Sequence, residues 1–196
     1  MMLTESNLRF SFPDNVNVIK FDDTNYFKNK FQNLPRAKGV DFVADSEKVI
    51  WFIEVKNCKG YESDNRYRIA PNNAKVHTAP TTVDVSDRES LDYEVAQKVA
   101  MTIACLVGAL TKPEHQGGDE LKPYCKSLTH GVVDAKQLKI LLFLEGDFGT
   151  RTHSKKMIMK ALASSIKNKL FPWLNCQVFV GDVANQHNRS MSVEFI

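Results

Sequence analysis

The hydrophobic pattern is strongest over residues 49–56, where β-branched and aromatic side chains fill most positions. Such a run is typical of a strand that is buried on both faces. Alternation along the strand puts Trp51 and Val55 on one face and Phe52 and Glu54 on the other. A carboxylate within an apolar strand needs a partner, because burying it unpaired is strongly unfavourable. Glu54 is therefore the first residue that requires an explanation.

The segment before this strand predicts its hairpin partner. Residues 39–44 form a second short apolar strand, and the polar stretch that follows suits a turn. A four-residue turn would place Asp41 opposite Phe52. Asp41 then lies on the face that carries Glu54 and Lys56. Two carboxylates and an ammonium group at the end of a hairpin suit a hard divalent cation and an activated water, and we expect them in an open cleft.

Hydrophobic periodicity predicts further elements on both sides of the hairpin. Helical spacing indicates helices at 25–33, from a capping pattern at 86–89 to about residue 111, and at 154–170. Apolar runs indicate strands at 138–145, 176–180 and 191–196, and weak alternation indicates extended structure over 7–20. The polar segments 57–85 and 112–137 are predicted loops. This order predicts an α/β protein with a mixed β-sheet whose central hairpin is flanked by helices.

Composition is typical of a globular protein. The length suits one domain spanning residues 1–196, with 43% hydrophobic and 25% charged residues. No apolar run approaches the roughly 20 residues that cross a membrane, and no signal-peptide pattern is present, so we expect a cytoplasmic protein with no membrane partner. Four cysteines without CxxC spacing fit reduced thiols. The net charge of +3 is too small to indicate a polyanionic partner by itself.

Asp41 and the tripeptide 54–56, which follows after twelve intervening residues, resemble the PD-(D/E)XK signature of the restriction-endonuclease-like nuclease superfamily. The resemblance covers about residues 38–57. Val40 stands where the signature has proline, a residue that takes no part in the chemistry. The three-letter part of the pattern recurs twice elsewhere in the chain without comparable strands. The paired apolar strands therefore carry the resemblance.

The resemblance implies a restriction-endonuclease-like core and hydrolysis of phosphodiester bonds. Asp41, Glu54 and the carbonyl of Val55 would bind Mg²⁺ or Mn²⁺. Asp41, Glu54 and Lys56 would form the catalytic set, with Lys56 orienting or deprotonating the attacking water and offsetting charge at the phosphorus. The implied partner is nucleic acid, with DNA favoured over RNA. Many members of the superfamily act as homodimers, and this chain could do the same.

The segment 151–170 carries an unusual charge pattern, with one arginine, five lysines and no acid. Arg151, Lys155 and Lys156 lie near the start of the predicted helix, where positive charge opposes the helix dipole. Together with Lys160 they form the predicted nucleic-acid-binding surface, because a helix N-terminus among lysines suits a phosphate backbone. The alternative is a set of solubilising lysines on an exposed face.

Several alternatives stay open. Asp22 and Asp23 could add an acid beside the site or cap a helix. Gln97 and Lys98 could lie beside the site or on a solvated helix face. The function itself has two interpretations, a metal-dependent nuclease or a catalytically inactive module that binds nucleic acid or protein. In the second, the acid and the lysine of the motif would form a buried ion pair.

Overall fold

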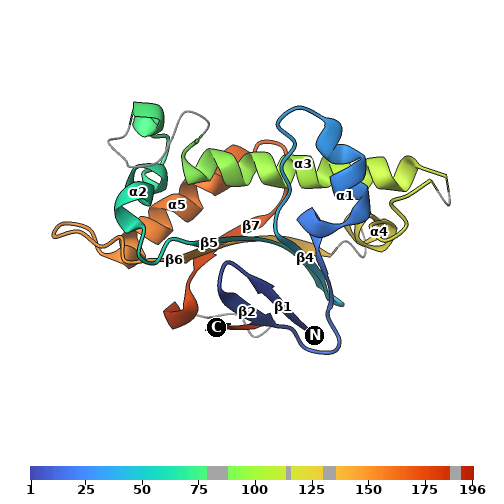
Figure 1. Cartoon of the computed structure of the whole chain (residues 1–196), viewed down its shortest axis with the longest axis horizontal. Helices are drawn as coiled ribbons and strands as arrows, with labels where there is room; N and C mark the ends of the chain where they lie inside the picture. Colours follow the sequence, from blue (N-terminus) through green and yellow to red (C-terminus); the bar gives the residue numbers. More distant parts are fainter. Residues whose placement is uncertain (79–87, 114–115, 130–135, 186–190) are drawn as a thin grey trace.

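A five-stranded sheet forms the middle layer of the protein, with β5 (Val49–Asn57) at its centre (Figure 1). This computed structural model describes residues 1–78, 88–113, 116–129, 136–185 and 191–196. The other strands of the sheet, in spatial order around β5, are β3 (Asn17–Lys20), β4 (Phe42–Asp45), β6 (Gln137–Glu145) and β7 (Gln177–Gly181). β3, β4 and β5 pair antiparallel, whereas β5, β6 and β7 pair parallel. The prediction of an α/β protein with a mixed sheet is confirmed.

The two faces of β5 belong to two different hydrophobic cores. Ile50 and Phe52 are fully buried in the core that the helices complete. Trp51, Ile53 and Val55 are buried in the core on the opposite face. The predicted alternation is therefore confirmed. Burial on both faces explains why the sequence of this strand is almost continuously apolar.

The helical layer covers one face of the five-stranded sheet. α3 (Leu91–Thr111) lies between β5 and β6 in the chain, and α5 (Lys155–Leu170) connects β6 to β7. The shorter helices are α1 (Asn25–Asn29), α2 (Glu62–Ile69) and α4 (Lys122–Thr129). Single 3-10 turns are η1 (Phe21–Asp23), η2 (Phe31–Asn33), η3 (Ala74–Thr78) and η4 (Val183–Asn185). α3 and α5 pack against each other above the sheet (Figure 1).

A smaller antiparallel sheet covers the other face of the large sheet (Figure 1). Its strands, in spatial order, are β1 (Met2–Glu5), β2 (Leu8–Ser11) and β8 (Ser192–Phe195). The predicted strand at 191–196 therefore exists, but it belongs to this second sheet. The prediction that helices flank the hairpin is correct for one face only, because strands from both ends of the chain cover the other.

The two predicted loops each contain a short helix that periodicity does not reveal. α2 lies within 57–85 and buries Ile69 alone among its residues, so it has no apolar stripe to detect. α4 lies within 112–137 and buries only Tyr124 and Cys125. In helices this short, tertiary contacts decide the structure more than the local pattern does.

α3 begins at Leu91, later than the predicted capping pattern at 86–89, of which residues 86–87 lie outside the described part of the chain. Among the described helices, α3 is long and apolar enough to span a membrane by length and composition, with a mean hydropathy of 1.3 over its most apolar window. Core helices of globular proteins pass the same test. In this structure Val95 and Leu106 of α3 are buried in the core against the sheet.

Phe10 connects the two sheets and provides a test of their packing. Its fully buried ring lies 5.1 Å from that of Phe42 and 5.3 Å from that of Phe143, measured between centroids. Phe10→Ala should lower the free energy of unfolding by about 3–5 kcal/mol, because it leaves a cavity between the sheets. Urea denaturation measures the change. Phe195→Ala, at an exposed position of β8, should change the free energy of unfolding by only about 0.5 kcal/mol. Equal effects of the two substitutions would contradict the packing described.

Candidate active site

The β4–β5 hairpin brings Asp41 beside Glu54. Phe42 pairs with Ile53, so the same register continued by one residue places Asp41 next to Glu54. The predicted register, with Asp41 opposite Phe52, is wrong by two residues, because the turn lies one residue later in the chain than expected. A shift of two residues keeps every side chain on its face of the sheet. The structure therefore brings the two acids together more closely than the sequence predicted.

Asp41 is buried where β4 begins, with 7% of its surface exposed. Its Oδ2 accepts a hydrogen bond of 2.6 Å from the backbone N–H of Val55. This bond ties Asp41 to the third residue implied as a metal ligand. Burial, and then the neighbouring Glu54 carboxylate, raise the pKa of Asp41 from its ordinary value of 3.8 to about 7. The Asp41 carboxyl therefore titrates near neutral pH.

Glu54 is 1% exposed and accepts hydrogen bonds from two lysines. Lys98 Nζ lies 2.7 Å from Oε1 and 2.8 Å from Oε2 of Glu54. Lys56 Nζ lies 2.8 Å from the same Oε1. These ammonium groups satisfy the requirement that a buried charge be paired. The site is consequently a packed cluster, and the expectation of an open cleft is not met.

The charge cluster continues from Lys56 to the start of α3. Lys56 Nζ lies 3.0 Å from Glu94 Oε1, and Arg68 of α2 donates a hydrogen bond to Glu94 Oε2. Burial raises the pKa of Glu94, but the positive charges of Lys56 and Arg68 outweigh this effect and lower the pKa to about 2. Burial lowers the pKa of Lys56, but Glu54 and Glu94 outweigh this and hold it above its ordinary value. Lys56 is therefore protonated in the metal-free protein.

Two of the open alternatives are decided by position. Lys98 faces the site, as its contacts with Glu54 show. Asp22 does not cap a helix, because Thr24 is the N-cap of α1. Asp22 Oδ1 is buried and has no hydrogen-bond partner among the described residues. Burial and then Asp23 raise the pKa of Asp22, and the charges of Lys20 and, to a smaller extent, Lys98 oppose this rise.

The sequence alone did not identify Glu94, and it indicated Arg68 only as one of several basic residues in a segment expected to overhang the site. One available signal was spacing, since Glu94 precedes Lys98 by four residues and so shares its helix face.

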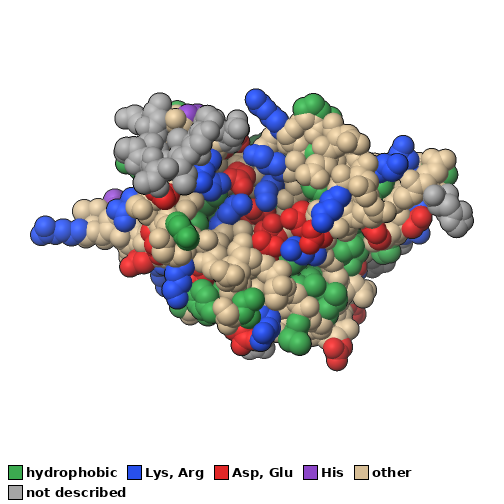
Figure 2. All heavy atoms as spheres, in the orientation of Figure 1, with side chains coloured by type: hydrophobic (Ala, Val, Ile, Leu, Met, Phe, Trp, Pro, Cys, Tyr) green, Lys and Arg blue, Asp and Glu red, His purple; other side chains and the backbone are tan. Residues whose placement is uncertain are grey.

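Gln97, the other helix candidate, has a buried Oε1 without a hydrogen-bond partner in the described part of the chain. Figure 2 shows acidic and basic side chains gathered between α2 and α1 on the face that it presents. Elements far apart in sequence therefore contribute charged groups to one region.

The site offers two of the oxygen ligands that a divalent cation needs. Asp41 and Glu54 offer the hard oxygen atoms that Mg²⁺ prefers, and Mg²⁺ usually takes one or two protein carboxylates together with water and phosphate oxygens. Within the described residues, no group of three or more His, Cys, Asp or Glu side chains is placed to hold a metal. The protein thus offers two carboxylates, and the ammonium group of Lys98 lies beside them.

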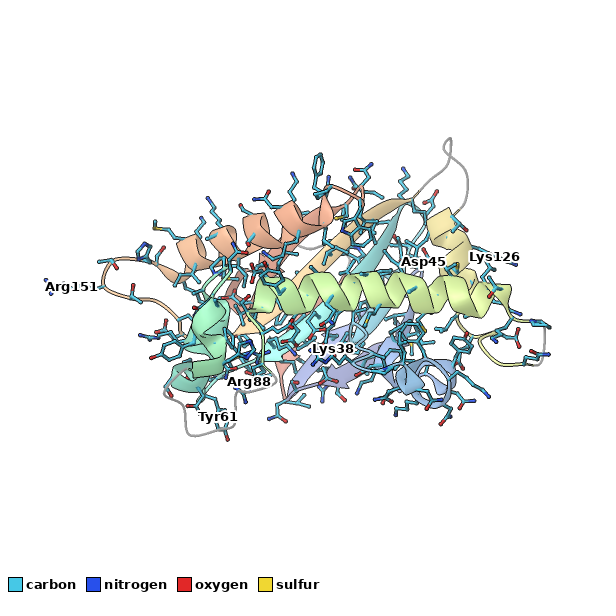
Figure 3. The ribbon with its side chains drawn as sticks, turned by 90° about the horizontal axis from the view of Figure 1, so that it is seen from above. Lys38, Asp45, Tyr61, Arg88, Lys126 and Arg151 are labelled. Atoms are coloured by element: carbon cyan, nitrogen blue, oxygen red, sulfur yellow. The ribbon has the colours of Figure 1, made fainter. Side chains whose placement is uncertain are left out.

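The predicted nucleic-acid-binding residues lie along α5 and the loop before it. Arg151 lies near the tip of the loop between β6 and α5, away from the body of the protein (Figure 3). Lys155 Nζ pairs with the buried Asp182 at 2.5 Å, so this lysine has a structural partner. Lys156 and Lys160 are exposed on α5. Two helical lysines of the predicted set thus remain on the outer surface.

The raised pKa of Asp41 predicts a pH dependence of stability. Between its ordinary value of 3.8 and about 7, the folded protein retains a proton that the unfolded chain has released. Stability therefore falls as the pH rises through this window, by up to about 4 kcal/mol. Asp41→Asn removes this loss, so the metal-free variant should exceed the wild type in stability at about pH 8 and resemble it near pH 4. Urea denaturation in the presence of EDTA measures the free energy of unfolding of the wild type and the variant at each pH. A variant that is less stable than the wild type at the higher pH would contradict the raised pKa.

Comparison with known proteins places the chain in a family without assigning an activity. One curated relative is a cysteine–tRNA ligase of Neisseria meningitidis serogroup A / serotype 4A (strain DSM 15465 / Z2491), 26% identical over 167 residues, covering 73% of this chain and 21% of the ligase. The chain thus spans about a fifth of the length of the curated relative that it matches. No solved structure matches. A family model described as a family of unknown function, DUF6661, matches residues 24–193, and the chain belongs to this family.

Proposed function

We propose that this protein is a nuclease that hydrolyses phosphodiester bonds with the help of Mg²⁺ or Mn²⁺, with DNA as the favoured substrate. The observation that carries the proposal is the meeting of Asp41 and Glu54 at the end of the hairpin, with Lys56 beside them. The mixed sheet around this hairpin is compatible with a restriction-endonuclease-like core. The similarity to a cysteine–tRNA ligase makes RNA the second substrate class to test.

Asp41 and Glu54, with the carbonyl of Val55, would hold the metal ion. When bound, the ion would neutralise charge on the phosphate and activate a water molecule. Asp41 has its pKa near 7 in the metal-free protein, so its carboxyl must lose a proton before it can bind the metal. The activity should accordingly increase as the pH rises through neutrality.

Lys56 would act as a hydrogen-bond donor. The carboxylates of Glu54 and Glu94 keep Lys56 protonated, because together they raise its pKa above the ordinary value. A protonated lysine can orient the attacking water and stabilise charge that develops on the phosphate, but it cannot accept a proton. Of the two roles that the sequence left open for Lys56, the structure therefore favours orientation and charge stabilisation.

A catalytically inactive binding module is the second candidate. The observation that favours it is charge balance, because every carboxylate in the described cluster lies near a cation. The acids are Asp41, Glu54 and Glu94, and the bases are Lys56, Arg68 and Lys98. Such a network can hold α2 and α3 against the sheet without any bound metal. A substitution that removes activity without removing stability separates the two candidates.

Asp41→Asn is that substitution. It removes a metal-binding charge but keeps an oxygen that can accept the N–H of Val55. For a nuclease, we expect it to lower the Mg²⁺- or Mn²⁺-dependent cleavage rate about 10²-fold or more, as for the loss of one preorganised electrostatic contact. The measurement is cleavage of single- and double-stranded DNA and of RNA under single-turnover conditions.

The control for this experiment is Asp23→Asn. Asp23 pairs with Lys20 and Lys28 on the outside of η1, and its loss should leave the cleavage rate unchanged. If the wild type cleaves none of the substrates with either metal, the nuclease proposal is wrong and the binding module stands. If Asp41→Asn cleaves as fast as the wild type, the assignment of the site is wrong.

The exposed lysines of α5 give a separate test of nucleic-acid binding. Lys156→Glu combined with Lys160→Glu should weaken binding and reduce the slope of log affinity against log salt concentration by about 2, because each lysine accounts for about one phosphate contact. Fluorescence anisotropy over a salt series measures both. The matched control reverses the charges of two other exposed lysines, Lys30 at the C-cap of α1 and Lys126 of α4 (Figure 3 shows Lys126 far from Arg151). Equal effects of the two double variants would indicate a general charge effect and contradict a binding surface on α5.

A further inference from the structure

Lys98 lies where a cation shared by the two acids would lie. Its Nζ is 2.7 and 2.8 Å from the two oxygens of Glu54 and 3.9 Å from Oδ1 of Asp41. The lysine side chain is 13% exposed, so water does little to screen these contacts. Both Glu54 oxygens are therefore already engaged by this one ammonium group.

We propose that Lys98 is a built-in competitor for the divalent cation at Asp41 and Glu54. The inference rests on the proposed function, which assigns the cation to these two carboxylates. An ammonium group and a divalent cation repel each other strongly at contact distance in a buried site. Both also need the same Glu54 oxygens. Lys98 must therefore leave Glu54 before the metal ion can bind.

The contacts distinguish Lys98 from Lys56. Lys56 has a second carboxylate partner, Glu94 at 3.0 Å, which can hold it when Glu54 binds another cation. Among the described residues, Lys98 forms ion pairs with the two acids of the site alone. Lys98 is therefore the lysine that a metal ion displaces, whereas Lys56 can stay.

Asp22 provides an acceptor for the displaced lysine. Its Oδ1 is buried with no hydrogen-bond partner among the described residues, and the charge of Lys98, after that of Lys20, lowers the pKa of Asp22. A buried oxygen of this kind gains a hydrogen bond when an ammonium group reaches it. Movement of Lys98 from Glu54 towards Asp22 would thus open the metal site and satisfy an unpaired acceptor at the same time.

The experiment measures Mn²⁺ binding to the protein without nucleic acid. Isothermal titration calorimetry gives the affinity, and loss of the electron paramagnetic resonance signal of free Mn²⁺ gives the bound fraction. Lys98→Met should bind Mn²⁺ about tenfold or more tightly than the wild type, because the binding-competent arrangement no longer competes with the ammonium group. Lys98→Gln, which keeps a hydrogen-bond donor, should also bind Mn²⁺ more tightly than the wild type. This variant replaces Lys98→Met if that protein fails to fold. Mn²⁺ should also raise the melting temperature of either variant more than that of the wild type.

The control is Arg68→Met, which removes one positive charge from the same cluster at the Glu94 end. A general charge effect would tighten binding equally in the Lys98 and Arg68 variants and would overturn the inference. Unchanged or weaker binding in the Lys98 variants, with Mn²⁺ still bound by the wild type, would also overturn it and leave the proposed function intact. If neither the wild type nor any of the variants binds Mn²⁺, both the inference and the metal-dependent function fail.

Discussion

The Glu54 carboxylate lies inside an apolar sheet with 1% of its surface exposed, and the surrounding structure compensates its charge. Two ammonium groups reach it, one from its own strand and one from α3. A buried charge that lost these partners would be strongly destabilising. The helices take part in this compensation, because α3 contributes Lys98 and Glu94 to the cluster and α2 contributes Arg68.

The unequal covering of the large sheet lets the cluster exist. The face that carries Trp51 and Ile53 packs against a second sheet, and Trp51, Ile53 and Val55 belong to the hydrophobic core there. The face that carries Phe52 and Glu54 packs against helices, whose polar residues can reach down onto a strand. Glu54 also lies towards the carboxyl end of β5, where β5 and β6 run parallel. In sheets of this kind, functional groups collect at the carboxyl ends of the strands.

The contacts of the cluster form a stable arrangement, and the function proposed above would require Lys98 to leave it. With Lys98 between the acids, the cluster is balanced and stabilises the packing of α3 on the hairpin. The ionised form of Asp41 is disfavoured in this arrangement, because burial and the charge of Glu54 raise its pKa to about 7. Strongly perturbed carboxyl groups collect at functional sites more often than at purely structural ones. Membership of a family of unknown function adds no activity, so the site itself must support the functional argument.

The sequence by itself determined the central strand, the alternation of its two faces and the conflict posed by Glu54. It also placed Asp41 on the correct face although the predicted register was wrong, because a shift of two residues preserves the side of a strand. Only the tertiary structure decided that Lys98, Glu94 and Arg68 complete the cluster. These contacts depend on how α2 and α3 pack across the sheet, and local periodicity contains no information about which polar residues of two distant helices will meet over one buried carboxylate.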